Sequence, residues 1–305
     1  MRKWSLAVAL LSLLAAACGP QETAPAGDGA SPTHQSAADC LQANRDELYT
    51  TGAYATRSLT VATGNPAFPP WWEGGTTEEH PEWEFNDPHL GQGYEGAVTF
   101  EVAERLGFSS DEVEFVPIGF NKSFAPGPKD FDFVLQQISF TPQRAEAVDF
   151  SESYYDVNQA LVSVQGSPLD GATSIEEIRG ATLGAPIGTT SLTYIEENIQ
   201  PTEQPAVYDD LAAAVQDLKN GQVDGIVVDL PTAFFVTAVQ IPKGVIVGQF
   251  PTVGSQEYFA MAFEKGSPLV ECVDLALQEM KEDGTLDGIR QEWLADNADA
   301  PVIEG

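Results

Sequence analysis

Residues 131–149 read Phe-Asp-Phe-Val-Leu-Gln-Gln-Ile-Ser-Phe-Thr-Pro-Gln-Arg-Ala-Glu-Ala-Val-Asp. The apolar run at 131–138 predicts a buried strand, and Thr141-Pro142 opens a helical turn that carries Arg144. Open α/β sheets bind ligands where a strand ends and a helix begins, and a guanidinium there can grip a carboxylate through two parallel hydrogen bonds. Arg144 is therefore the first candidate binding residue, with a surface ion pair to a neighbouring carboxylate as the alternative.

Strands and helices alternate on both sides of this stretch. We expect further strands at residues 58–63, 113–116, 159–164, 181–185, 225–228 and 259–263. We expect helices at residues 94–106, from the capping box at 174–177, at 209–220, at 268–283 and up to 294. Alternation of this kind predicts an α/β fold with largely parallel sheets covered by helices.

The alternating pattern forms two α/β units, followed by a C-terminal segment that has no sheet of its own. We therefore expect two lobes, with chain crossings near Asp156 and Gly254. Lobe 1 would contain residues 40–155 plus 256–305, and lobe 2 would contain residues 156–255. A chain of 305 residues is long enough to give each lobe its own core.

The charge of the chain excludes one class of partner. There are 14 basic and 46 acidic residues, which gives a formal net charge of -32. Such a chain repels a phosphate backbone, so we expect no nucleic-acid partner. The acidic residues are scattered and do not form runs, as is typical of solvated faces.

The N-terminus has the pattern of an export signal. Arg2 and Lys3 precede an apolar core at residues 6–14 that is too short to remain in a bilayer as a spanning helix. Small residues then precede Cys18, which resembles a bacterial lipobox and implies a signal peptide at 1–17 and a lipid on this cysteine. Residues 18–39 lack periodicity, and we expect a flexible tether to the membrane.

Two cysteines remain if Cys18 carries a lipid. Cys40 and Cys272 form an even pair in a compartment that is oxidising, so we favour a disulfide between them. Two free buried thiols are the alternative.

Residues 71–93 break the alternating pattern with a stretch rich in Gly, Pro, Trp and acidic side chains. His80 and His89, with Glu79 and Asp87, could supply metal ligands. Their spacing matches no tight ligand motif, so we expect no metal or cofactor. A long loop at the rim of a cleft is the preferred interpretation.

Several motifs occur in order along residues 59–294. They are Thr63-Gly-Asn-Pro-Ala-Phe-Pro-Pro, Ser139-Phe-Thr-Pro-Gln-Arg, Val148-Asp-Phe-Ser-Glu-Ser-Tyr-Tyr, Gly188-Thr-Thr-Ser, Leu218-Lys-Asn-Gly-Gln-Val-Asp-Gly-Ile-Val-Val-Asp and Lys281-Glu-Asp-Gly-Thr-Leu. This series resembles the extracellular solute-binding proteins of polar amino acid ABC importers, family 3. The resemblance implies a periplasmic-binding-protein-like fold of type II, in which two crossover strands join two α/β lobes with a cleft between them.

The resemblance also implies a function and its partners. A protein of this kind binds a polar amino acid between its lobes and delivers it to an ABC permease that has a separate ATPase subunit. No G-x-x-x-x-G-K-[ST] phosphate loop occurs in this chain, which agrees with a separate energy source. The location would be extracytoplasmic, with the lipid on Cys18 anchoring the protein at the cell surface or in the periplasm.

Roles in ligand binding follow from the same motifs. The resemblance assigns the α-carboxylate to Arg144 and the α-ammonium to Asp229, because a zwitterion requires one fixed cation and one fixed anion. The hydroxyls and backbone amides of Ser139, Thr189 and Thr190 would complete the carboxylate cradle.

Phe68 and Phe120 match the two aromatic plates that enclose the ligand. Asn65 and Gln137 would face its side chain. Asn65 stands where binders of basic amino acids often carry aspartate, which disfavours lysine and arginine. Trp71, Asn121 and Lys122 are further candidates for contacts with that side chain.

Two other functions are compatible with the same two-lobed binding site, here called the clamp. A lyase or dehydratase acting on a small carboxylic acid would need a general acid or base, for which Asp229, Glu95 or Lys122 are available. A sensor or adhesion module would use the clamp for signalling. We expect a binding protein and no enzyme, because an arginine and aspartate pair suits zwitterion binding without turnover.

Overall fold

The computed structural model describes residues 36–48, 58–294 and 300–305. The expected signal peptide, Cys18 and most of the tether lie outside the described residues. Helix α1 (Ala37–Leu48) takes up the last three tether residues, so the tether prediction is wrong for 37–39. The helix forms there because its apolar residues Ala37, Cys40 and Leu41 are buried at helical spacing. In the described part of the chain, no helix has both the length and the apolar character needed to cross a bilayer.

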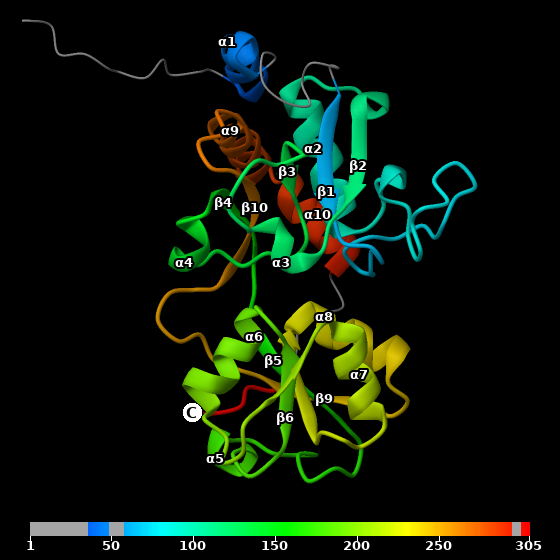
Figure 1. Cartoon of the computed structure of the whole chain (residues 1–305), viewed down its shortest axis with the longest axis vertical. Coiled ribbons are helices and arrows are strands. Elements are labelled where there is room, and N and C mark those ends of the chain that lie inside the picture. Colours follow the sequence, from blue (N-terminus) through cyan, green and yellow to red (C-terminus); the bar gives the residue numbers. More distant parts are fainter. Residues whose placement is uncertain (1–35, 49–57, 295–299) are drawn as a thin grey trace, which may run out of the picture. The chain divides into compact units, whose positions relative to one another are not determined.

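The first sheet defines lobe 1 and has the strand order β2-β1-β3-β10-β4 (Figure 1). Its strands are β1 (Leu59–Thr63), β2 (Val113–Pro117), β3 (Phe133–Val134), β4 (Val148–Asp156) and β10 (Tyr258–Glu264). β1 runs parallel to β2 and β3, whereas β10 runs antiparallel to β3 and β4.

The second sheet defines lobe 2 and has the order β7-β6-β8-β5-β9. Its strands are β5 (Gln159–Val164), β6 (Leu183–Pro186), β7 (Ala206–Tyr208), β8 (Gly225–Asp229) and β9 (Gly244–Gln249). β6 runs parallel to β7 and β8, and β5 runs antiparallel to β8 and β9. Both sheets are thus mixed and not largely parallel as expected. The reversed strands are β10 in lobe 1 and β5 in lobe 2, in which the chain arrives from the other lobe.

Helices occupy most of the connections between strands. The α-helices beyond α1 are α2 (Tyr94–Leu106), α3 (Phe120–Ser123), α4 (Pro142–Ala145), α5 (Ile175–Ile178), α6 (Thr190–Tyr194), α7 (Leu211–Lys219), α8 (Leu230–Phe235), α9 (Leu269–Glu282) and α10 (Thr285–Leu294). Short helical turns are η2 (Pro88–Leu90), η3 (Ser110–Glu112), η4 (Ile195–Ile199) and η5 (Val236–Gln240). The sequence analysis missed α1, α3, α6, α8, β4, β7 and β9.

Both sheets bury their two faces. In β10, Phe259, Met261 and Phe263 belong to the core that includes α2 and α9, and Ala262 belongs to the core on the opposite face. The same alternation holds in β8, where Val227 packs on one side and its neighbours on the other. Strands buried on both faces read as continuous apolar runs, which is why the sequence identified them.

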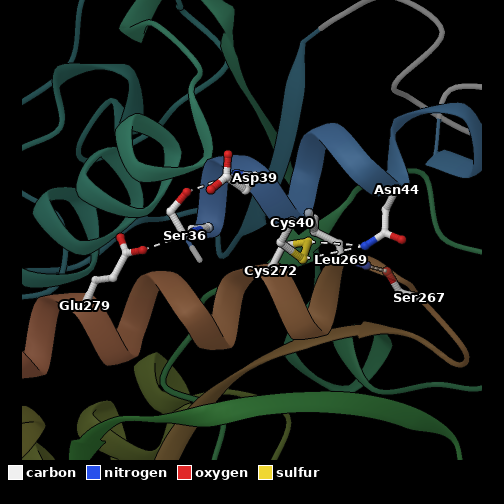
Figure 2. Close-up of a disulfide and its surroundings, with 9 residues drawn as sticks. Ser36, Asp39, Cys40, Asn44, Ser267, Leu269, Cys272 and Glu279 are labelled. Carbon is white, nitrogen blue, oxygen red and sulfur yellow. Dashed lines mark hydrogen bonds between the residues drawn. A yellow bond between two sulfur atoms is a disulfide. The ribbon is translucent and has the colours of Figure 1, made fainter. Parts of the chain in front are cut away.

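The expected disulfide is confirmed. Cys40 of α1 and Cys272 of α9 are bonded, with 5.3 Å between their Cα atoms. Figure 2 shows the two helices side by side with the disulfide between them. The Asn44 amide nitrogen lies 3.6 Å from the Cys40 sulfur, and the Ala37 backbone N–H donates to Glu279 Oε1 at 3.0 Å. The cross-link therefore fixes α1 on the surface of lobe 1.

The last described residues pack on lobe 2, although the sequence analysis assigned residues 256–305 to lobe 1. Val302 pairs with Gln249 of β9, and Glu304 pairs with Ser174. The edge strand β9 offers unpaired backbone groups, and the Ile303 N–H donates to the Gln249 carbonyl at 2.9 Å. The Ile303 side chain is fully buried in the lobe 2 core.

Candidate functional site

Two parallel strands from each lobe end at one cavity of about 550 Å³. β1 and β3 end there in lobe 1, and β6 and β8 end there in lobe 2. Each strand is followed within a few residues by polar side chains or by the start of a helix. A helix start has free backbone N–H groups, which can donate hydrogen bonds to a ligand. This is the position at which open α/β sheets hold ligands.

The structure brings together all nine side chains that the sequence analysis proposed for ligand binding. Each of them lines this cavity: Asn65, Phe68, Phe120, Gln137, Ser139, Arg144, Thr189, Thr190 and Asp229. Asn121 and Lys122 also line it. Residues more than 150 positions apart in the sequence thus share one space.

Arg144 is positioned by the start of α4. The Thr141 hydroxyl accepts a hydrogen bond from the Arg144 backbone N–H at 3.1 Å, which caps the helix. The guanidinium donates to the Ser139 carbonyl at 2.5 Å and to the Gly188 carbonyl of lobe 2 at 2.8 Å. It lies 4.3 Å from the centre of the Phe124 ring. The side chain is thus held in one direction by both lobes.

Arg144 remains a cation at neutral pH. Burial lowers its pKa to about 10, and Glu257 acts in the opposite direction. The residue is only 8% exposed, so a carboxylate bound to it would be largely shielded from water.

Gly188 permits the approach of the two lobes at this point. Its φ is +78°, and a Cβ atom there would lie 2.2 Å from the Asn121 Oδ1. Only glycine avoids both the strained backbone and the collision, and its carbonyl is the one that accepts from Arg144.

A polar network lies behind the hydroxyls of the cavity. The Glu257 carboxylate accepts from Ser139 Oγ at 2.5 Å and from Gln159 Nε2 at 3.1 Å. The Gln159 side-chain oxygen accepts from Ser191 Oγ at 2.6 Å, and Ser139 Oγ lies 3.4 Å from Thr190 Oγ1. The sequence analysis missed Gln159 and Glu257. A glutamine opening an otherwise apolar strand was a signal for the first, but Glu257 follows a Gly/Ser loop and gave none.

Asp229 ends β8 and caps α8. One carboxylate oxygen accepts from the Thr232 backbone N–H and the other from the Thr232 hydroxyl, both at 3.0 Å. Burial raises the pKa of Asp229 to about 6, against the effect of these hydrogen bonds. The group is therefore ionised at neutral pH and keeps acceptor capacity towards the cavity.

The loop at 71–93, here called the rim loop, contacts two of the proposed binding residues. Phe68 packs between Phe85 of the rim loop and Phe235 of α8, at ring-centre distances of 5.5 and 6.0 Å. The Asn65 amide donates to the Glu82 carbonyl at 2.8 Å, and its oxygen accepts from the Glu84 N–H at 3.1 Å. The Asn65 side chain thus anchors the rim loop.

Trp71 does not reach the cavity. Its ring packs in the lobe 1 core against Tyr94, Tyr155 and Phe259. The next residue, Trp72, lines the cavity instead, and its indole N–H donates to Glu95 at 3.1 Å. A shift of one residue along the loop decides which indole faces the site.

Glu95 is fully buried beneath the cavity floor. Its carboxylate accepts from the Gln137 backbone N–H at 2.8 Å, from the Gln137 amide, from the Tyr154 hydroxyl and from Trp72. Gln137 has a φ of 48°, a left-handed conformation that is unfavourable for a residue with a side chain. The hydrogen bonds that Glu95 accepts from Gln137 stabilise this conformation and so orient the cavity floor.

Glu95 should make stability depend on pH. Burial raises its pKa to about 7, against the hydrogen bonds that it accepts, whereas its ordinary value is 4.5. Below about pH 4.5 both folded and unfolded states carry the proton. Between that value and about pH 7 only the folded state keeps it, so the free energy of unfolding falls as pH rises, by about 3 kcal/mol in total.

The Glu95→Gln variant lacks this titration. Urea denaturation of both proteins at about pH 5 and about pH 8 gives the difference in their free energies of unfolding at each pH. We expect the wild type to lose stability relative to the variant between the two conditions. An unchanged difference would show that Glu95 keeps an ordinary pKa in the folded protein.

Two proteins of known name are similar to this chain in sequence. The arginine-binding extracellular protein ArtP of Bacillus subtilis (strain 168) is 27% identical over 228 residues, which are 72% of this chain and 84% of ArtP. The L-cystine-binding protein TcyJ of Escherichia coli (strain K12) is 28% identical over 205 residues, which are 66% of this chain and 74% of TcyJ.

Solved structures of similar proteins have the same fold. An ancestral arginine-binding protein bound to arginine superposes with a TM-score of 0.61 at 29% identity and covers 78% of this chain and 98% of its own. An ancestral arginine-binding protein bound to glutamine also has a TM-score of 0.61 at 29% identity, with coverage of 78% of this chain and 97% of its own.

These relatives are named as binding proteins and not as enzymes. The model of one family matches residues 74–296, which is more than half of the chain. The chain therefore belongs to the bacterial extracellular solute-binding proteins, family 3.

Proposed function

We propose that this protein is the substrate-binding component of an ABC importer and that it binds a polar amino acid between its two lobes. The observation that carries the proposal is the pairing of Arg144 from lobe 1 with Asp229 from lobe 2 along one cavity. A free amino acid carries one carboxylate and one ammonium group, and this pair offers one fixed partner for each.

The carboxylate would bind Arg144 and the hydroxyls around it. Ser139 and Thr190 lie on opposite lobes with 3.4 Å between their oxygens, and the N-terminus of α6 begins at Thr190. Thr189, the cap of that helix, lines the same wall. The ammonium would bind the Asp229 carboxylate.

Ligand contacts from both lobes also provide a mechanism for closure. A ligand held by Arg144 and Asp229 makes its full set of contacts only when the lobes are together, so binding shifts the population towards the closed state. Phe68 and Phe120 would cover the two faces of the ligand, and both line the cavity.

The cavity favours a neutral polar side chain in the ligand. Among the described residues that line it, the carboxylates are Asp209, Asp210 and Asp229, all from lobe 2. On the lobe 1 side, Gln137 lines the cavity, and the buried Thr63 hydroxyl has no hydrogen-bond partner among the described residues. The amide of Asn65 is taken by the rim loop. We therefore expect an amide or hydroxyl side chain to bind better than arginine.

Delivery would require partners outside this chain. We propose a membrane permease with a separate ATPase subunit as the receiver of the amino acid. Retention at the cell surface or in the periplasm would depend on the lipid on Cys18, which lies outside the described residues. The names of the relatives support this class of function, since they describe arginine-binding and cystine-binding proteins.

A thermal-shift screen against the common amino acids tests the function. The protein is unfolded and refolded first, to remove ligand carried through purification. A ligand at about 100 times its dissociation constant stabilises the folded state by about 2.7 kcal/mol, or about 5 to 10 °C for a protein of this size. We expect shifts of that size with a few neutral polar amino acids and a smaller shift with arginine.

The same screen includes small carboxylic acids that lack an amino group. A shift with these alone would remove Asp229 from the proposed role and would favour the alternative of a lyase or dehydratase. Chromatography of the incubated ligand then separates the two functions, because a binding protein returns its ligand unchanged.

A further inference from the structure

The rim loop carries two of the three histidines of this chain, and the structure stacks them on each other. The rings of His80 and His89 lie 3.6 Å apart between centres, with 8° between their planes. A neutral imidazole presents a nitrogen lone pair that can bind a metal ion.

A ring nitrogen of His89 lies beside a carboxylate oxygen. Its Nδ1 is 2.8 Å from the Asp87 Oδ1, close to the distance of about 3.3 Å that separates two ligand atoms of one tetrahedral zinc ion. His80 has a similar neighbour, since its Nδ1 lies 3.6 Å from Glu82 Oε1. A carboxylate behind an imidazole, as Glu82 is behind His80, raises the basicity of a metal-binding histidine.

Asp87 is held in place from several sides and is only 1% exposed. It accepts hydrogen bonds from the Thr77 hydroxyl and from the His89 backbone N–H. The carboxylate is therefore fixed beside the two rings.

The three side chains form one cluster of donors. One ligand atom from each of His80, Asp87 and His89 lies within 4.8 Å of the other two. In a tetrahedral zinc site with bonds of 2.0 to 2.1 Å, donor atoms lie about 3.3 Å apart. The cluster would close on an ion if the donor atoms moved inward and the two stacked rings turned so that each pointed a nitrogen at the ion. Glu79, which the sequence also offered, is not in the cluster.

We propose that the rim loop binds one divalent transition-metal ion of the Zn²⁺ class through His80, Asp87 and His89. Two imidazoles and one carboxylate are a donor set that suits Zn²⁺, and the fourth position stays open to water. This proposal departs from the expectation of no metal site, because folding of the loop brings together side chains whose sequence spacing carries no motif.

The position of the cluster gives it a connection with the amino acid site. The rim loop supplies Phe85 against Phe68 and two backbone groups to Asn65. An ion that joins residues 80, 87 and 89 would restrain the loop beside the cavity mouth. Metal binding is nevertheless a separate property, and its measurement does not depend on which amino acid is bound.

The experiment is calorimetric titration of the EDTA-treated, buffer-exchanged protein with ZnCl₂, with MgCl₂ as a comparison. We expect one Zn²⁺ per chain and at least about 100-fold weaker binding in His80→Ala and His89→Ala. His34→Ala is the matched control, since it removes the third histidine, and it should bind as the wild type does. Co²⁺ should give the visible absorption of a tetrahedral site in the wild type and not in His80→Ala.

Two results would overturn the proposal. Zn²⁺ binding that persists in both histidine variants would place the metal on surface carboxylates, which this acidic chain has in excess. Absence of Zn²⁺ binding by the wild type would also overturn the proposal. His89 also packs on Phe115, so His80→Ala, with the more exposed ring, keeps the test valid if His89→Ala fails to fold.

Discussion

Arg144→Ala is expected to weaken binding of the amino acid identified in the screen by about 100-fold to 10,000-fold. The variant loses a buried cation and a pair of charge-assisted hydrogen bonds to the ligand carboxylate, each of which contributes about 1.5 to 3 kcal/mol. Arg144→Lys should fall in between, because it keeps the charge but not the planar fork. Isothermal titration calorimetry gives the three dissociation constants.

Arg179→Ala provides the matched control. Arg179 lies in lobe 2 away from the cavity, where it pairs with the exposed Glu176. Its removal should leave ligand affinity unchanged, and circular dichroism should show that both alanine variants are folded. If Arg144→Ala binds as tightly as the wild type, the carboxylate does not bind at Arg144 and the proposed cradle is wrong.

The second large effect concerns stability. Replacement of both cysteines, in the double variant Cys40→Ser and Cys272→Ser, should lower the free energy of unfolding by about 4 kcal/mol. The bond joins positions 232 residues apart, and a cross-link that closes a long loop removes much of the entropy of the unfolded chain. For a protein of this size, the loss corresponds to a melting temperature lower by about 10 °C.

Calorimetric melting with and without reductant measures this effect. Reductant should destabilise the wild type and leave the double variant unchanged. Neither cysteine lines the cavity, so ligand affinity should be the same in all samples. Equal melting temperatures of wild type and variant would mean that the disulfide contributes nothing to stability.

Local signals were enough to predict the helical turn that holds Arg144 and the strand that leads to Asp229. Thr141 caps α4 through its own side chain, and the apolar run at 225–228 precedes Asp229. Asp229 also caps α8, but that helix was not predicted. Helix α2 was predicted with the bounds that the structure shows, because Gly93 precedes it and Gly107 ends it in a left-handed conformation.

Partners that are distant in sequence could not be predicted in this way. Glu257 reaches Ser139 across 118 positions, and no pattern near either residue indicates the other. The strand expected at 131–138 is reduced to Phe133–Val134 because Gln137 turns into a left-handed conformation that Glu95 stabilises from another helix. Tertiary contacts override the local apolar run there.

The pairing of the C-terminal residues with β9 has a practical consequence for work with the purified protein. Val302 and Ile303 shield the edge of the lobe 2 sheet, so a truncation that removes them would leave an open strand available to another molecule. An affinity tag or fluorescent label fused directly after Gly305 would crowd the same edge. A spacer of several flexible residues, or attachment at an exposed loop of lobe 2, would keep reporter and fold independent.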